Sequence, residues 1–201
     1  MMQLFDNPAS PFCRIVQVVL RETDQAKDVE TAFAVGHALA PEQMPTAHNP
    51  SGRIPTLVRP DGPALYDSRV ICRFLDDRAK AGLYTERSLW DILTLEATAH
   101  GIMEASLAMV YEGRVRPEDK QMQDWVDANW VKVARGLDVL EERWMGHLQG
   151  PLNMGQISVG CALGYLDFRL DARNWRQGRT VLTDWYEAFA KRDSMAATAP
   201  H

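Results

Sequence analysis

The sequence predicts a chain of two parts, an N-terminal α/β domain built on a mixed sheet and an all-helical domain after it. Strand and helix patterns alternate through residues 1–78, whereas every pattern in residues 86–201 is helical. The stretch between them, residues 79–85, changes composition and contains glycine. We therefore expect a first domain over 1–78, a linker over 79–85 and a helical domain over 86–201.

The opening stretch, residues 2–20, organises the first domain. Residues 3–5 have the composition of a short strand, and residues 6–9 are typical of a turn. Ser10 and Pro11 then predict a helix start, because serine caps free N–H groups and proline needs no donor at the first helical position. The helix that follows is too apolar for an exposed face, so we expect it to pack against a sheet.

The alternation continues to the end of the first domain. Residues 29–35 are apolar and β-branched and predict a second strand, whereas the polar residues 37–49 can hold at most a short irregular helix. Residues 54–66 predict two strands around the Asp-Gly turn at 61–62. A helix capped by residues 67–68 follows. A strand-helix-strand start gives parallel pairing and a hairpin gives antiparallel pairing, so the sheet should be mixed.

The second half is predicted to hold four helices. Residues 86–114 and 117–148 each carry apolar side chains mostly on one face. A third helix, uncharged over its first turns, begins at Asn153, with Gln156 three residues later as a variant of the capping box. A fourth lies near the C-terminus. The tail from Ser194 is small and polar, and we expect it to be loose.

Composition and charge exclude several functional classes. The chain has 201 residues and a formal net charge of −5 at pH 7, which argues against a nucleic-acid partner. It has no stretch of about 18 apolar residues, so we expect no membrane partner. The N-terminus begins with a strand pattern and not with the basic and apolar segments of a signal peptide.

Cysteine and histidine usage favours a cytoplasmic protein without a metal. Cys13, Cys72 and Cys161 are odd in number and widely separated, which suits a reducing compartment. Neither they nor the five histidines show the spacing of metal ligands. We therefore expect no metal site and a cytoplasmic location.

Three motifs, in this order and spacing, resemble the cytosolic glutathione transferase family. Residues 10–14, Ser-Pro-Phe-Cys-Arg, resemble the active-site turn of bacterial members that have serine or cysteine at the helix start. Residues 49–57 resemble the family's loop and cis-proline strand, and residues 65–68 resemble the segment that holds the γ-glutamyl end of glutathione. Residues 100–104 and 162–166 are similar to a bacterial subgroup. The resemblance implies a thioredoxin-like first domain, a helical-bundle second domain and a homodimer.

The resemblance implies that Ser10 is the catalytic residue of a detoxifying transferase. Glutathione would be the co-substrate, and its sulfur would be joined to a small hydrophobic electrophile. A free thiol has a pKa near ~8.5, and lowering it by about two units needs roughly 3 kcal/mol of preferential binding to the thiolate. The Ser10 hydroxyl, as a hydrogen-bond donor, and the positive end of its helix would supply this together. The alternative is that Ser10 is only a helix cap.

The resemblance also implies the residues that bind glutathione. A cis bond between Ile54 and Pro55 would expose the Ile54 backbone to the cysteinyl part, by strand addition on a small scale. The Asp67 carboxylate would take the amine, and Ser68 would take the γ-glutamyl carboxylate at a helix N-terminus. The alternatives are simple capping for Asp67 and Ser68, and an ordinary trans proline that opens an edge strand for Ile54 and Pro55. Arg53 would otherwise be a surface arginine, and Phe12 would only pack. The expected contacts are Phe12, Arg53, Ile54, Pro55, Asp67 and Ser68.

The electrophile is expected between the two halves, beside Met103, Leu107 and Tyr111. Methionine and aromatic side chains line adaptable sites, although at helical spacing they also serve as core. Two other functions stay open. Cys13 occupies the second cysteine position of a Cys-Pro-x-Cys pattern, and would allow glutathione-dependent thiol–disulfide exchange or deglutathionylation. The chain would otherwise be a non-catalytic binding protein with the transferase fold.

Overall fold

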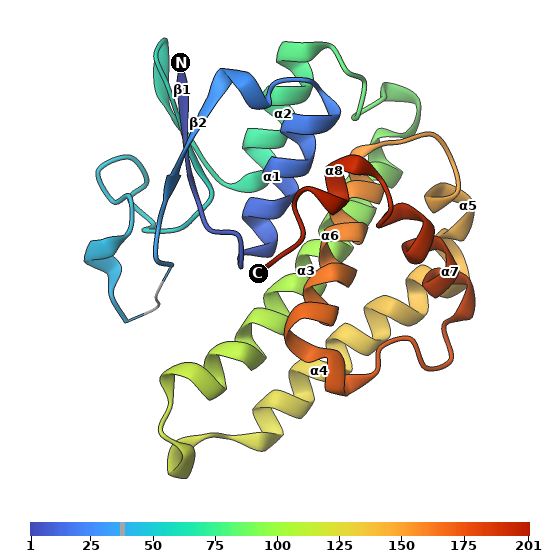
Figure 1. Cartoon of the computed structure of the whole chain (residues 1–201). Helices are drawn as coiled ribbons and strands as arrows, with labels where there is room; N and C mark the ends of the chain where they lie inside the picture. Colours follow the sequence, from blue (N-terminus) through green and yellow to red (C-terminus); the bar gives the residue numbers. More distant parts are fainter. Residues whose placement is uncertain (37–38) are drawn as a thin grey trace. The chain divides into compact units, whose positions relative to one another are not determined.

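The computed structural model of the chain describes residues 1–36 and 39–201 (Figure 1). The chain divides into two compact units: the first contains residues 1–84 and 193–201, and the second contains residues 85–192. The first unit is a four-stranded mixed sheet with helices, and the second is helical, as the sequence predicts.

The sheet of the first unit has the order β2-β1-β3-β4. β1 pairs parallel with β2 and antiparallel with β3, and β3 pairs antiparallel with β4. Leu4 and Leu57, from the two central strands, are fully buried. The edge strand β2 is largely exposed. The strands span Met2–Asp6 (β1), Val29–Phe33 (β2), Thr56–Arg59 (β3) and Gly62–Leu65 (β4).

Two helices, α1 (Pro11–Glu22) and α2 (Ser68–Ala79), pack against each other. Nearly all of the apolar side chains of α1 are buried, which confirms that this helix has no free apolar face. Short 3-10 turns, η1 (Ala26–Asp28) and η2 (Pro41–Gln43), complete the first half. The turn η2 falls in the polar stretch 37–49, whose first two residues lie outside the described part of the chain.

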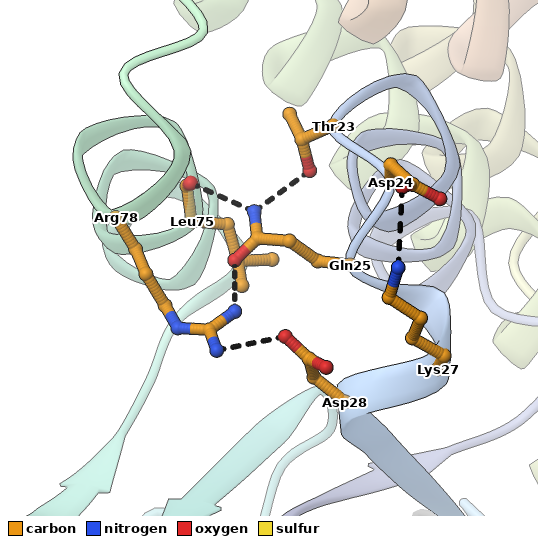
Figure 2. A network of polar contacts seen from close by, with 7 residues as sticks. All are labelled: Thr23, Asp24, Gln25, Lys27, Asp28, Leu75 and Arg78. Atoms are coloured by element: carbon orange, nitrogen blue, oxygen red, sulfur yellow. Dashed lines mark hydrogen bonds and ion pairs between the residues drawn. The ribbon is translucent and has the colours of Figure 1, made fainter.

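A polar network joins the end of α1 to α2 (Figure 2). The Gln25 side chain is buried, and its Nε2 donates to the Leu75 carbonyl at 2.9 Å and to the Thr23 hydroxyl at 2.7 Å. Arg78 donates to the Gln25 side-chain oxygen and forms an ion pair with Asp28 at 2.7 Å. Because buried amide groups need partners, these bonds favour one relative position of the two helices.

The C-terminal tail is ordered, and the expectation of a loose tail is wrong. Residues 193–201 cluster with the first unit and not with the helical one, and they begin with the short helix α8 (Asp193–Ala196). Met195 is buried, and its carbonyl accepts a hydrogen bond from Arg14 Nη2 at 3.1 Å. The Ser194 hydroxyl donates to the Glu22 carboxylate. Burial of Met195 against α1 gives this small, polar tail an anchor that its composition does not show.

The second unit contains the remaining helices. Its central helix α6 is buried along nearly its whole length and packs on α3. The capping box at its start is confirmed: Asn153 N–H donates to Gln156 Oε1 at 2.8 Å, and Gln156 N–H donates to Asn153 Oδ1 at 3.3 Å. The helices are α3 (Leu89–Val115), α4 (Gln123–Val139), α5 (Met145–Leu148), α6 (Met154–Leu170) and α7 (Thr180–Phe189). Short turns are η3 (Glu86–Ser88), η4 (Glu118–Lys120) and η6 (Asp171–Arg173).

The single helix expected over residues 117–148 is divided. A π-turn, η5 (Leu140–Trp144), separates α4 from α5. Glu141 in this turn accepts hydrogen bonds from the N–H groups of Val181 and Leu182, at the start of α7. Among the described residues, no helix combines the length and apolar character needed to cross a bilayer.

Candidate functional site

The sheet topology brings three sequence motifs to one end of the first unit. β1 ends at Asp6, and its neighbour Phe5 is paired with Thr56, the first residue of β3. β4 ends at Leu65, which is paired with Leu57 near the same end of β3. The turn after β1, the Ile54-Pro55 segment before β3 and the Asp67-Ser68 segment after β4 therefore lie at this one end of the sheet.

Ser10 is the N-cap of α1, as predicted. Its backbone is extended (φ −88°, ψ 123°), and its Oγ accepts a hydrogen bond from the Cys13 N–H at 3.3 Å. Because Oγ is the acceptor in this bond, the hydroxyl keeps its own hydrogen as a donor, with the Cys13 thiol as a neighbour. The half-buried Ser10 therefore combines a donor with the positive end of a twelve-residue helix.

Cys13 is held as a neutral thiol. Its side chain is 0% exposed, and burial, together with the charge of Asp6, raises the pKa of the Cys13 thiol well above its ordinary value. Asp6 is itself buried, and its Oδ2 accepts a hydrogen bond from Gln17 Nε2 at 2.7 Å. Since the thiolate is the reactive form of cysteine, these surroundings disfavour nucleophilic chemistry at Cys13.

In the loop before β3, the peptide bond between Ile54 and Pro55 is cis, as the sequence motif implied. Asn49 stabilises this loop: its buried amide donates to the Arg53 carbonyl at 3.0 Å and to Thr56 Oγ1 at 3.1 Å. Its Oδ1 accepts from the N–H and the hydroxyl of Ser51. Within the described part of the chain, the Ile54 backbone N–H and C=O form no hydrogen bond. They are therefore open to an extended peptide.

Asp67 and Ser68 form the start of α2. Asp67 is the N-cap: its carboxylate accepts from the Arg69 N–H at 3.0 Å and pairs with the Arg69 guanidinium at 2.8 Å. Both side chains of this ion pair are about half exposed, at 51%. Ser68 is only 1% exposed, and its Oγ has no hydrogen-bond partner among the described residues. A buried hydroxyl without a partner is costly, and a ligand carboxylate at this helix N-terminus would satisfy it.

The two remaining predicted contacts of the first unit differ in exposure. Arg53 is exposed, and its guanidinium makes no hydrogen bond or ion pair with the described residues. Phe12 is half-buried in the first turn of α1. Together with the two helix N-termini, Arg53 supplies positive potential for a ligand that carries several negative groups. This donor set fits glutathione, which has two carboxylates and a thiol.

The predicted electrophile residues of the second unit all lie on α3. Met103 is fully buried, whereas Leu107 and Tyr111, one and two turns later, are half-buried. A hollow of about 420 Å³ lies elsewhere on this helix, lined by α3 residues between positions 98 and 105 and α4 residues between 129 and 136. Met103, Leu107 and Tyr111 do not line it. The described residues contain no group of three or more histidine, cysteine or acidic side chains that could hold a metal ion.

Sequence reasoning missed the residues that hold the motifs in place. Asn49 and Thr56 belong to the motif before β3, and their side chains also hold this loop together through internal hydrogen bonds. Asn7 Nδ2 donates to the Ala34 carbonyl at 2.9 Å and so joins the turn after β1 to the end of β2. The Asn-Pro pattern at residues 49–50 is typical of a side chain that bonds to nearby backbone, and would have been the available signal for Asn49 alone.

Family models match both halves of the chain. The N-terminal domain of glutathione S-transferase matches residues 9–78, and the C-terminal domain of glutathione S-transferase matches residues 123–188. An uncharacterized GST-like protein of Escherichia coli K12, YibF, is 32% identical over 99% of this chain and 98% of its own length.

Solved structures support the same grouping. A glutathione transferase family member from Pseudomonas fluorescens Pf-5 with bound glutathione is 40% identical, covers 100% of both chains and has a TM-score of 0.97. A second structure described in the same way holds S-(propanoic acid)-glutathione, with a TM-score of 0.93. A glutathione S-transferase from Methylobacillus flagellatus KT with glutathione bound is 34% identical over 100% of both chains, with a TM-score of 0.85.

Proposed function

The chain belongs to the glutathione S-transferase family, and from this premise we propose that it conjugates glutathione to a small hydrophobic electrophile. The observation that carries the proposal is the Ser10 hydroxyl at the N-terminus of α1. It lies at the end of the sheet that also holds the Ile54 backbone and the Ser68 hydroxyl, and these two groups have no partner among the described residues. Each of these three groups is polar and open to a bound tripeptide.

In the proposed reaction, Ser10 donates a hydrogen bond to the sulfur of glutathione and lowers the pKa of that thiol. The sulfur anion attacks a carbon of the electrophile, an S–C bond forms, and the leaving group departs with its electron pair. Ser10 keeps its proton throughout, so it needs no basic partner. The helix N-terminus adds favourable potential at the sulfur.

The remaining residues are proposed to position glutathione. The Ile54 backbone, exposed by the cis bond to Pro55, would pair with the cysteinyl part. Ser68 and the N-terminus of α2 would bind the γ-glutamyl carboxylate, and Asp67 would bind its amine while it also contacts Arg69. The exposed pair between Asp67 and Arg69 contributes only about 0–1 kcal/mol, so sharing it with a ligand costs little.

Arg53 is proposed to bind the glycine carboxylate of glutathione, with Phe12 beside the peptide. In the second unit, Met103, Leu107 and Tyr111 would contact the electrophile. The relatives support the proposal: the Pseudomonas fluorescens protein is described with glutathione and with S-(propanoic acid)-glutathione bound. The second ligand is a thioether of glutathione, the kind of compound that conjugation produces. A homodimer, a detoxifying role and a cytoplasmic location belong to the same proposal.

The Ser10→Ala variant tests the role of the hydroxyl. The ultraviolet absorbance of the thiolate, measured against pH with bound glutathione, should show the thiol pKa returning toward ~8.5. Since a shift of about two units changes the thiolate fraction roughly 100-fold, kcat/KM at acidic pH should fall by about 10- to 100-fold. An unchanged thiol pKa in this variant would remove Ser10 from the mechanism.

Two further measurements separate the alternative functions. Cys13→Ala should retain most of the conjugating activity, because its thiol is buried and protonated. Loss of most activity in that variant would instead favour thiol–disulfide or deglutathionylation chemistry. Calorimetric titration should show glutathione binding, and the absence of binding at millimolar concentration would favour a non-catalytic protein with this fold.

A further inference from the structure

Two arginines of the second unit, Arg114 on α3 and Arg169 on α6, have no acidic partner. Within the described part of the chain, neither guanidinium makes a hydrogen bond or an ion pair. Arg169 Nε is fully buried and without an acceptor, and the Arg169 guanidinium lies 3.8 Å from the centre of the Phe168 ring. Arg169 as a whole is half-buried, and a buried N–H donor without an acceptor is unfavourable, so an anion bound here would satisfy it.

The packing of the two helices brings these arginines together. α3 and α6 lie side by side (Figure 1). At their starts, Gly155 lies so close to Leu95 that a Cβ on the glycine would be 2.8 Å from the Leu95 Cβ. Near their ends, Tyr165 is close enough to Tyr111 and Arg114 for them to influence its ionisation. The helices are therefore parallel, and their C-terminal turns are neighbours.

Each helix contributes a tyrosine and an arginine on one face. Tyr111 and Arg114 are three residues apart on α3, and Tyr165 and Arg169 are four residues apart on α6, spacings that place side chains together on a helix surface. On α3 the same face continues toward the N-terminus through Leu107. Exposure increases along it, from the half-buried Leu107 and Tyr111 to the exposed Arg114. The face is apolar at one end and cationic at the other.

Two carboxylates close in sequence to these arginines, Glu112 and Asp167, are bound by other groups. Glu112 accepts hydrogen bonds from Arg116 at 2.9 Å and from the Met122 N–H at 3.0 Å. Asp167 is bound by Trp175 and by Arg176. Burial and the nearby charge of Arg114 lower the pKa of Arg169. Two like charges therefore lie near each other, with no carboxylate bound to either among the described residues, and a bound anion would reduce their repulsion.

We propose that Arg114 and Arg169 bind a carboxylate of the electrophile, whose apolar part contacts Leu107 and Tyr111. The planar guanidinium forms two parallel bonds to a carboxylate, which makes arginine the suitable residue for this group. The inference rests on the proposed conjugating function, and it narrows the substrate class to electrophiles that join an apolar body to a carboxylate.

A matched pair of alkylating substrates tests the proposal. With 4-(bromomethyl)benzoate and its methyl ester, the glutathione sulfur forms a bond to the benzylic carbon and bromide leaves with the electron pair. For Arg114→Gln and Arg169→Gln, kcat/KM for the acid should fall by about tenfold or more, the loss expected for a charge-assisted bidentate contact, while the value for the ester should change less than about twofold.

Three variants control for charge and folding. Arg116→Gln makes the same change in net charge two residues from Arg114, but it removes an arginine that pairs with Glu112, and it should leave the acid-to-ester ratio unchanged. Arg169→Lys keeps the positive charge but loses the planar guanidinium, so it should lose only part of the selectivity for the acid over the ester. Arg114→Gln, at an exposed position, keeps the test valid if a change at Arg169 unfolds the protein. Equal effects on acid and ester, or the same loss in Arg116→Gln, would overturn the proposal.

A binding measurement separates failure of this proposal from failure of the proposed function. The unreactive 4-methylbenzoate is titrated in the presence of glutathione and followed by calorimetry. Binding to the unchanged protein that weakens about tenfold in Arg114→Gln supports the carboxylate site even if neither substrate is conjugated. Absence of binding, or equal binding by Arg114→Gln, refutes the site even if the ester is conjugated.

Discussion

Replacing Asn49 with alanine would remove four hydrogen bonds from the loop that precedes β3. The Asn49 amide donates to the Arg53 carbonyl at 3.0 Å and to Thr56 Oγ1 at 3.1 Å. Its carbonyl oxygen accepts from the Ser51 N–H at 3.0 Å and from the Ser51 hydroxyl at 2.6 Å. Asn49 is only 1% exposed, so water would not readily take the place of its side chain.

The expected loss of stability depends on which hydrogen bonds the partners of Asn49 can still form in the variant. The Arg53 carbonyl still accepts from Thr56 Oγ1 at 2.8 Å, and the exposed Ser51 can bond to water. Each lost hydrogen bond contributes about 0.5–1.5 kcal/mol net, so the four together, partly replaced, predict a loss of about 2–3 kcal/mol in the free energy of unfolding. Because this loop presents Ile54, we also expect the Kd for glutathione to rise about tenfold, or roughly 1.4 kcal/mol.

Urea unfolding and calorimetric titration with glutathione measure the two effects. Ser51→Ala is the matched control: it removes one of the four bonds at an exposed position and should cost less than about 1 kcal/mol. A loss below about 0.5 kcal/mol in Asn49→Ala, with an unchanged Kd, would show that the loop does not depend on this side chain.

Two further predictions concern the tail and the core of the second unit. Met195→Ala, although close to the end of the chain, should lower the free energy of unfolding by about 2–4 kcal/mol, because Met195 is 1% exposed. Met122→Ala, at a side chain 60% exposed, should change it by less than about 0.5 kcal/mol, and equal effects in urea unfolding would refute the anchoring of α8. Burial raises the pKa of Tyr165 to about 12, so the folded state keeps a proton that the unfolded chain releases above about pH 10. The free energy of unfolding should therefore fall by up to roughly 2.7 kcal/mol as the pH rises from about 10 to about 12. Tyr165→Phe should flatten this part of the stability profile, and identical profiles for the two proteins would contradict the assignment.

The helix starts could be predicted because capping is local chemistry. Ser10 with Pro11, Asp67, and Asn153 with Gln156 each act on N–H groups within three residues along the chain. The distance in sequence is short, so residue type and spacing suffice to predict the contact. The same holds for the succession of strands and helices along the first unit and for its mixed sheet, which hydrophobic pattern and turn residues predict.

The candidate site was predicted in its residues but not in its supports. The motifs gave Ser10, Ile54 and Ser68, whereas their surroundings depend on contacts between distant segments. Asn7 reaches the carbonyl of Ala34, 27 residues later in the chain, and sequence spacing carries no information on such a bond. That the Ser68 hydroxyl has no partner among the residues the structure describes likewise depends on everything packed around it.

By itself, the sequence determined the class of the fold, the helix caps and the motifs that form the site, because these depend on neighbours along the chain. Only the tertiary structure decided the π-turn that divides residues 117–148 and the docking of Met195 on α1. It also decided that Arg114 and Arg169 have no acidic partner within the part of the chain that the structure describes. The physical reason is that burial and counter-ions are properties of a position in space. A side chain of given type is satisfied or left without a partner by residues that the folded backbone, and not the order of the sequence, brings to it.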